Sequence, residues 1–485
     1  MPTLLETMIF SDRFGSLGPA FSHQQNPTPL PDPYLIALSP TSMALCNIHA
    51  EQTQSEVFTR IFTGNVLAAG CTPRAAVYSG HQFGQWAGQL GDGRALLLGE
   101  LAGNEIQLKG AGLTPFSRMG DGRAVLRSSI REFLCSEAMV GLGIPSTRAL
   151  CITGSNQMIM REMPESTAVV TRVAPSFIRF GSFEHWYYRN DLESLTQLAD
   201  FVIANYYPYL SDQANPYTSM LTEVTRRTAH LMAQWQTVGF MHGVMNTDNM
   251  SILGLTLDYG PFGFMEAYNP GHICNHSDDL GRYSYANQPQ IGEWNCQALA
   301  QALLPLIGTV EDAMTALSCY KTEYQSKLGQ LWHAKLGLQT ESAQDRDLIA
   351  SMLTMMQINR LDFTVFFRRL ADIRKQDDSM DYLISDLCLD RSAFEDWIRR
   401  YRARLITETS TDDERQRAMR AANPKYILRK YLAQIAIDAA QRGDFSEIAR
   451  LTQILARPFD EQPEHESYAS LPPDWGRELS VSCSS

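Results

Sequence analysis

One stretch of the sequence, residues 242–260 (HGVMNTDNMSILGLTLDYG), gathers side chains whose types and spacing suit phosphate chemistry. It predicts a loop, a short strand, a turn at Gly254 and a second strand that ends just before Asp258. Such a tight hairpin would bring Asn249 and Asp258 to neighbouring strand ends. An amide oxygen and a carboxylate are ligands that Mg²⁺ accepts alongside nucleotide phosphates. Asp248 lies beside them as a candidate base.

Turn chemistry is the competing explanation, because Asn, Asp and Gly are common in ordinary turns. Either motif alone, N-x-D at residues 246–248 or D-Y-G at residues 258–260, favours that explanation. The two motifs occur together, however, and they follow a long helix predicted at Met220–Val238. The combination favours a metal site.

The order of these residues resembles the catalytic segment of protein kinases, which carry H-R-D-x-x-x-x-N, a hairpin and then D-F-G. His242 stands at the His position, Asn249 at the Asn position and Asp258 at the start of the triplet. Val244 replaces the Asp that positions the attacking hydroxyl in kinases. This departure argues against ordinary hydroxyl phosphorylation, and Asp248 is the nearby carboxylate that could substitute.

The elements that must position this segment begin with two predicted strands, Ala95–Leu101 and Glu105–Lys109. Ile106 and Leu108 alternate with Gln107 and Lys109, so the lysine is expected to face away from the apolar side. Its order in the chain matches the kinase lysine that binds phosphates.

The next element is a helix predicted at Val125–Val140. Its apolar stripe is expected to contain Leu126, Ile130, Phe133 and Leu134. Glu132 lies off that stripe and is the expected partner of Lys109, while Glu137 competes for the same role.

Glycines and arginines supply candidate phosphate contacts. Gly91, Gly93 and Arg94 stand where kinases carry their glycine-rich loop, and glycines allow a nucleotide close to the backbone. A second loop that contains Asp121 and Gly122 opens the predicted helix and is expected to offer an anion or ribose contact. Two further arginines flank the expected junction between the halves of the chain, either as surface ion-pair partners or as bidentate clamps on a polyphosphate: Arg172 and Arg179.

Short strands are predicted through the first half of the chain and helices through the second. The further strands are Ala149–Thr153, Gln157–Arg161 and Ala168–Val173. The further helices are Leu192–Tyr207, Lys321–Leu336, Leu348–Asp372, Ser392–Ile406 and Tyr426–Asp438. The pattern predicts an α+β, protein-kinase-like fold with two lobes and a cleft between them.

The expected N-terminal lobe covers residues 1–170 and the helical C-terminal lobe residues 171–455. The second lobe would contain the catalytic segment 242–260 and an activation-like segment at 261–285. Residues 456–485 form the expected tail.

Composition disfavours several classes of function. The chain has 41 basic and 53 acidic residues and a net charge of −12, which disfavours binding to nucleic acid or to anionic membranes. No apolar run is long enough to span a bilayer, and the first residues do not resemble a secretory signal. The nine cysteines are scattered without a CxxC pair, so a cytoplasmic protein is expected.

Three long motifs, together with the terminal SCSS, closely resemble the selenoprotein O family in its bacterial, cysteine-containing form. These motifs lie at residues 78–100, 108–134 and 242–266. The resemblance runs over essentially the whole chain.

The resemblance implies a kinase-like fold with adenylyltransferase activity. ATP would bind in a flipped orientation, so that AMP passes to Ser, Thr or Tyr hydroxyls of other proteins, and UMP transfer from UTP is also attributed to the family. Asn249 and Asp258 would hold Mg²⁺ or Mn²⁺, and Asp248 would accept the proton. Lys109 would hold phosphates and pair with Glu132. The nucleotide would be lined by Gly91, Gly93, Arg94, Asp121, Gly122, Arg172, Arg179 and Asp258.

The resemblance also implies a redox pair, because the family can tie this region to its C-terminal Cys or Sec by a disulfide. Here the pair would be Cys274 and Cys483, and two unrelated thiols are the alternative. Two other functions stay open, a conventional phosphotransferase and a nucleotide-binding scaffold without turnover. A monomer that acts on protein substrates is expected.

Overall fold

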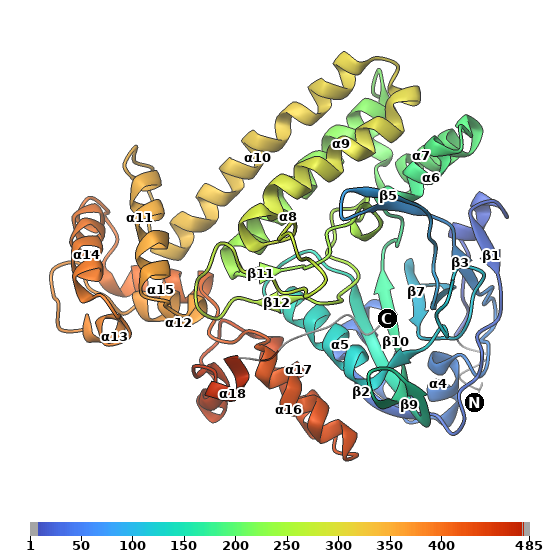
Figure 1. The fold of residues 1–485 in the computed structure, drawn as a ribbon, viewed down its shortest axis with the longest axis horizontal. Coiled ribbons are helices and arrows are strands. Elements are labelled where there is room, and N and C mark those ends of the chain that lie inside the picture. Colours follow the sequence, from blue (N-terminus) through green and yellow to red (C-terminus); the bar gives the residue numbers. More distant parts are fainter. Residues whose placement is uncertain (1–7, 478, 480–485) are drawn as a thin grey trace.

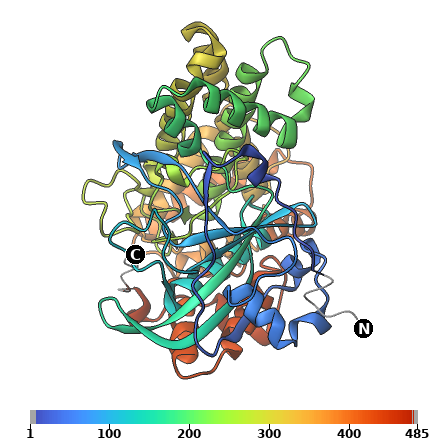
Figure 2. The ribbon, with the colours of Figure 1, turned by 90° about the vertical axis from the view of Figure 1, so that its right-hand side faces the viewer.

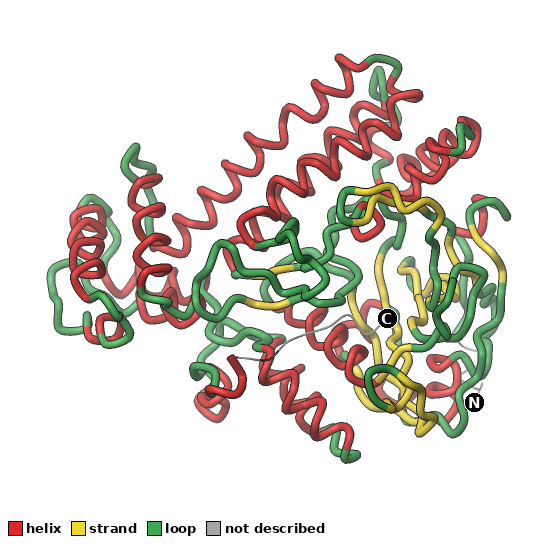
Figure 3. The backbone as a smooth tube through the Cα atoms, viewed as in Figure 1, coloured by secondary structure: helices red, strands yellow, loops and turns green. Residues whose placement is uncertain are grey.

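The computed structural model describes residues 8–477 and 479 and has an α+β architecture. The strands gather in the N-terminal region, and the remainder of the chain is mostly helical (Figure 3). Figure 2 shows the sheet region in the lower half of the molecule and a group of long helices projecting above it.

Within the described residues, the main sheet has eight strands, and all their pairings are antiparallel. Their order is β1 (Ser22–Gln24), β3 (Arg74–Ala76), β6 (Ala95–Leu101), β7 (Asn104–Lys109), β10 (Pro164–Ala174), β9 (Arg148–Met160) and β2 (Tyr34–Leu38), with β8 (Ala124–Val125) paired to β10. A separate hairpin is formed by β4 (Ser79–Gln82) and β5 (Gln85–Gln89).

Both faces of the sheet are covered, which fixes where Lys109 points. Leu96, Leu98, Ile106 and Leu108 pack on one face with helix α4 (Glu56–Thr63). Helix α5 (Leu126–Gly141) packs against β9 and β10 on the other face (Figure 1). Because side chains alternate along a strand, the residue after Leu108 faces α5. The sheet therefore presents Lys109 to the helix that carries Glu132.

The helical region begins after β10. Its helices are α6 (Phe180–Tyr188), α7 (Leu192–Tyr206), α8 (Pro216–Val238), α9 (Gln288–Ile307), α10 (Val310–Leu336), α11 (Asp345–Ile358), α12 (Phe363–Leu370), α13 (Tyr382–Ser385), α14 (Arg391–Ile406), α15 (Asp412–Ala422), α16 (Lys430–Gln441), α17 (Ser446–Leu455) and α18 (Asp474–Arg477). Helices α8, α9 and α10 pack side by side, and α8 leads directly into the segment 242–260 (Figure 1).

The last long helices return to the N-terminal region. Helices α16 and α17 pack against α5 (Figure 1). The ends of α5 and α17 approach so closely that a Cβ on Gly141 would overlap the carbonyl of Leu455. Helix α5 is thus enclosed by the sheet and by these two helices, and most of its residues are buried.

The strands predicted at Ala95–Leu101 and Glu105–Lys109 are confirmed, as are most of the long helices. Three predictions of where a strand or helix begins and ends are wrong. The strands predicted at Ala149–Thr153 and Gln157–Arg161 are one strand, β9, which pairs with β10 along its length with two shifts of register. The helix predicted at Leu348–Asp372 is two helices, because Asp362 caps α12 by accepting a hydrogen bond from the Val365 N–H (2.9 Å). The helix that ends at Leu336 begins at Val310 rather than at Lys321, and α9 was not predicted at all.

The predicted hairpin at residues 250–257 is also wrong. Its two halves meet at a single bridge, between Met250 and Thr256. The first half instead pairs with the start of α6 and the residue before it: Arg179 forms a bridge with Ser251, and the Phe180 N–H donates to the carbonyl of Met250 (2.9 Å). The Thr256 N–H donates to the carbonyl of Pro145 (2.8 Å). Distant segments therefore hold this loop in place of a local hairpin.

None of the helices in the described part of the chain is long and apolar enough to cross a membrane.

A buried lysine in the helical region gives a first testable prediction. Lys335 lies in α10 with its Nζ 4.1 Å from the centre of the Phe367 ring. Burial lowers the pKa of Lys335 from 10.5 to about 7. The folded state thus binds this proton more weakly than the unfolded chain does, so the cost to stability is complete below pH 7 and disappears as the pH rises towards 10.5. We expect Lys335→Met to raise the melting temperature clearly at pH 6.5 and less at pH 9.5.

Lys321→Met is the matched control, since Lys321 lies on the same helix with an exposed side chain. It should leave the melting temperature nearly unchanged at both pH values. A Lys335→Met protein that melts lower than the parent at pH 6.5 would contradict the argument.

Candidate active site

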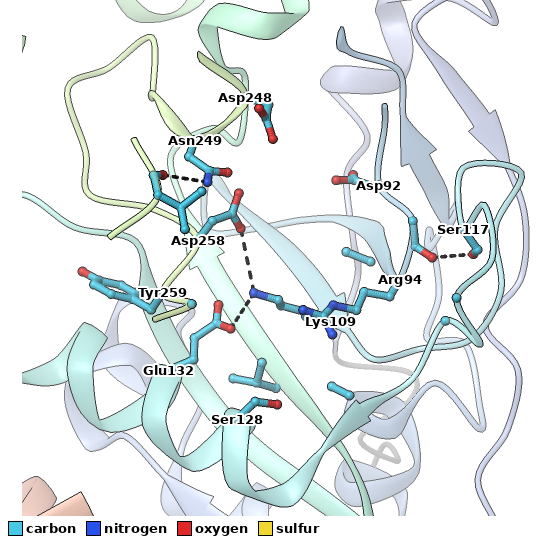
Figure 4. A pocket seen from close by; sticks show the side chains of 18 of the residues that line it. Asp92, Arg94, Lys109, Ser117, Ser128, Glu132, Asp248, Asn249, Asp258 and Tyr259 are labelled. Carbon is cyan, nitrogen blue, oxygen red and sulfur yellow. Dashed lines mark hydrogen bonds and ion pairs between the residues drawn. The ribbon is translucent and has the colours of Figure 1, made fainter. Parts of the chain in front are cut away.

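A cavity of about 530 Å³ lies between the sheet region and the segment that follows α8. Most of its wall comes from the β4–β5 hairpin, the turn before β6, strands β7 and β10, the loop and first turns of α5, and the segment 244–261. The predicted site residues on this wall are Gly91, Gly93, Arg94, Lys109, Asp121, Gly122, Glu132, Arg172, Asp248, Asn249 and Asp258. Figure 4 shows Lys109 extending between Glu132 and Asp258.

Lys109 joins the two regions of the chain. Its Nζ lies 2.7 Å from Glu132 Oε2 and 3.9 Å from Asp258 Oδ1. Burial lowers the pKa of Lys109, an effect that Glu132 partly offsets. The competing residue, Glu137, lies elsewhere and pairs with Arg148 (2.9 Å) and Ser39 (2.6 Å). The structure therefore brings Glu132, and not Glu137, to Lys109.

Two arginines clamp Asp258. Arg172 lies on the cavity wall and reaches both Glu132 Oε1 (3.1 Å) and Asp258 Oδ1 (2.9 Å). Arg179 lies behind the wall, where its Nη1 contacts Asp258 Oδ2 (2.6 Å) and the carbonyl of Asp248 (2.8 Å). Both arginines are almost fully buried, so neither is a surface ion-pair partner. Arg179 supports Asp258 from behind rather than facing the cavity.

The charge around Asp258 keeps it ionised. Burial on its own would raise the pKa of this carboxyl, but Arg172, Arg179 and Lys109 hold it well below its usual value. Asp258 also has a positive φ of 62°, which an aspartate tolerates at some cost. At the cavity, charged side chains of the sheet region and of the helical region thus converge on one ionised carboxylate.

The loop before Asp258 is shaped by its own hydrogen bonds. The Asn249 Nδ2 donates to the carbonyl of Val244 (2.9 Å), which leaves the Asn249 Oδ1 available to a ligand. The Val244 N–H donates to His242 Nδ1 (3.4 Å), so the His242 Nε2–H donates to the carbonyl of Leu257 (2.8 Å). His242 therefore fastens the loop just ahead of Asp258.

Asp248 is a further carboxylate on the wall, next to Asn249 in the chain. Burial raises the pKa of Asp248 to about 7, and Arg179 opposes that rise. The side chain lies in a short 3-10 turn, Thr247–Asn249, in contact with the β4–β5 hairpin.

The glycines in the turn before β6 allow close packing on the side of the cavity that the sheet region forms. A Cβ at Gly91, where φ is 102°, would lie 2.5 Å from the Phe116 ring. Asp92 between the glycines is buried and accepts hydrogen bonds from the Ala76 N–H (3.1 Å) and the Gln107 amide (3.2 Å). Asp121 is already paired with Arg161 (2.8 Å).

Sequence reasoning missed several cavity arginines: Arg118, Arg123, Arg127, Arg131 and Arg161. A signal for three of them was present, because Arg123, Arg127 and Arg131 recur at a spacing of four across the start of a helix. Together with Arg94, Lys109 and Arg172, the whole set gives the wall eight basic side chains against five acidic ones, on a protein whose net charge is −12.

Cys274 is buried, and its Sγ lies 3.7 Å from the carbonyl of Met241. Burial raises the pKa of this thiol to about 12. Its proposed partner, Cys483, lies outside the described residues, so the disulfide stays a prediction.

A cationic cavity that faces a carboxylate and an amide oxygen suits an anionic ligand of the nucleotide kind. The family model described as "Protein adenylyltransferase SelO" matches residues 4–456 of the chain. A protein nucleotidyltransferase YdiU from Herminiimonas arsenicoxydans is 59% identical over 489 residues, covering 99% of this chain and 98% of the relative. The relatives with the same description from Paraburkholderia xenovorans and Burkholderia multivorans are 54% and 53% identical, over 97% and 100% of this chain and 95% and 98% of the relatives.

These matches define the chain as an enzyme of the nucleotidyltransferase class. It belongs to the SelO family of protein adenylyltransferases.

Proposed function

We propose that the enzyme transfers AMP from ATP to Ser, Thr or Tyr hydroxyls of protein substrates and releases pyrophosphate. The observation that carries the proposal is the junction on the cavity wall, where Lys109 and Arg172 each pair with both Glu132 and the ionised Asp258. Val244, where a kinase has its catalytic Asp, argues against transfer of the γ-phosphoryl group. UTP is a second proposed nucleotide.

We further propose that the fold is protein-kinase-like. The support is a lysine on a sheet strand paired with a glutamate on the following helix, and an Asn and an Asp-Tyr-Gly triplet supplied by the helical region. In protein kinases the same pairing of a strand lysine with a helix glutamate must be in place for activity.

The residues present fit a divalent cation, Mg²⁺ or Mn²⁺. Asp258 stays ionised, and Asn249 is oriented by its bond to Val244 so that its Oδ1 is free to coordinate. One carboxylate and one amide oxygen, with nucleotide phosphates, make a normal ligand set for Mg²⁺. When bound, the cation would neutralise charge on the phosphates.

In this proposal the cavity holds the triphosphate with its pyrophosphate end towards Lys109, Arg94 and Arg172. The acceptor hydroxyl oxygen attacks the α-phosphorus, and the bond from that phosphorus to the oxygen bridging to the β-phosphate breaks. The hydroxyl proton passes to Asp248. The cationic side chains stabilise the negative charge that develops on the leaving pyrophosphate.

The test is paired labelling. The purified enzyme is incubated with Mg²⁺ and a mixed protein substrate, with ATP radiolabelled at either the α- or the γ-phosphate. We expect protein-bound label only from α-labelled ATP. Label only from γ-labelled ATP would make the enzyme a kinase, and ATP binding without any transfer would favour a scaffold.

A further inference from the structure

The β4–β5 hairpin packs directly against the loop that carries Asp248. The His81 N–H donates to Thr247 Oγ1 (2.7 Å), and the Phe83 N–H donates to Asn246 Oδ1 (3.1 Å). These two bonds attach one strand and the turn of the hairpin to the residues just before Asp248.

A buried carboxylate holds the hairpin and the loop together. Glu184 in α6 is fully buried, pairs with His81 Nδ1 (2.5 Å) and also accepts a hydrogen bond from Thr247 Oγ1. Ser79 Oγ lies 2.8 Å from His185 Nδ1 on the same helix. The hairpin is therefore held in a defined position beside the loop.

The two oxygens of Asp248 meet the hairpin differently. The Gln82 Nε2 donates to Oδ2 (3.3 Å), and both side chains lie on the cavity wall. Oδ1 is buried against Gly80, where an added Cβ would lie 2.9 Å away, and it makes no hydrogen bond to the described part of the chain. A proton acceptor needs an oxygen that its donor can approach, and the hairpin shields Oδ1.

We propose that Gln82 is a positioning residue for the transfer reaction, which holds the Asp248 carboxylate with Oδ2 towards the acceptor hydroxyl. This inference rests on the proposed function. A carboxylate oxygen has two lone pairs, so Oδ2 receives the Gln82 amide hydrogen on one side and the proton of the attacking hydroxyl on the other. Gln82 itself exchanges no proton.

The test uses Gln82→Met, which keeps the length of the side chain and removes the donor. We expect kcat for transfer from α-labelled ATP to fall roughly 10- to 100-fold, the usual cost of a misplaced reacting group. The KM for ATP should stay within about twofold, because the change acts on the acceptor side of the reaction. Gln85→Met is the matched control, since Gln85 is the cross-strand partner of Gln82 and its side chain is exposed. It should keep the parent kcat.

Gly80→Ala is a second, independent variant. Its new Cβ would push on Asp248 Oδ1 and Thr247 Oγ1 from behind without removing any donor from the cavity. We expect it to lower kcat with an unchanged KM, as Gln82→Met does.

Asp248→Asn distinguishes the role of Asp248 as the base from the role of Gln82 as its positioning residue. If Asp248→Asn keeps the parent kcat, Asp248 is not the base and the proposed proton transfer is wrong. If Asp248→Asn is inactive while Gln82→Met keeps the parent kcat, only the role of Gln82 is overturned. A rise in the KM for ATP that accounts for the whole loss in Gln82→Met would also overturn it, because Gln82 would then be a nucleotide contact.

Discussion

Replacing Asp258 with asparagine is expected to remove at least 99.9% of AMP transfer, a loss of roughly 10³-fold or more, of the size seen when a key charge is lost from phosphoryl-transfer sites. The change takes away the ionised carboxylate that is proposed to bind the metal. It also leaves Arg172 and Arg179 buried without the negative charge that both of them contact. Removing one partner from a buried ion pair costs about 3–5 kcal/mol, so the melting temperature should fall as well.

The measurement is transfer from α-labelled ATP beside thermal unfolding of the same samples. Asp212→Asn is the control, since Asp212 has an exposed side chain far along the chain from the site. It should change neither quantity. An Asp258→Asn enzyme that retains a tenth of the parent activity would contradict both the metal site and the role of the junction.

The second large effect is expected from Lys109→Met and from Glu132→Gln. Lys109 places a positive charge 2.7 Å from Glu132 and 3.9 Å from Asp258, and its loss should cost roughly 10²- to 10³-fold in kcat/KM, comparable to losing a strong charged donor in other active sites. Glu132→Gln should cost less, since Lys109 keeps its charge but loses the partner that orients it. Lys109→Arg should not restore the parent kcat/KM, because a planar guanidinium does not fit a position shaped for a point charge.

Glu137→Gln is the matched control on the same helix. Glu137 is as buried as Glu132 but pairs with Arg148, away from the cavity. We expect this variant to lower the melting temperature and to keep the parent kcat/KM for the folded enzyme. Equal losses of kcat/KM in Glu132→Gln and Glu137→Gln would show that helix stability, and not the pairing with Lys109, decides activity.

The sheet side of the site was predictable because its signals are local. Strand alternation alone is enough to turn Lys109 away from the apolar face that contains Ile106 and Leu108. The same reasoning could not decide whether Glu132 or Glu137 is the partner of Lys109. An apolar stripe identifies the buried face of a helix only when the other face meets solvent, and α5 is buried on nearly all sides by the sheet, α16 and α17.

The helical side was less predictable because its contacts join distant parts of the chain. The loop at 250–257 has the turn glycine of a hairpin, yet its backbone pairs with the residues before α6 and with Pro145. Arg179 was expected to face a ligand, and only the folded chain places it behind Asp258. The hydrogen bond from Gln82 to Asp248 joins residues that are 166 positions apart in the sequence, and no sequence motif links the two.

The return of α16 and α17 to cover α5 has a consequence for how the enzyme is made. During synthesis the N-terminal sheet and α5 leave the ribosome hundreds of residues before the helices that complete their packing. Until then the helix that carries Glu132 has one uncovered side. Catalytic competence is therefore expected to arrive only at the end of translation, which would keep an unfinished nascent chain from modifying its neighbours.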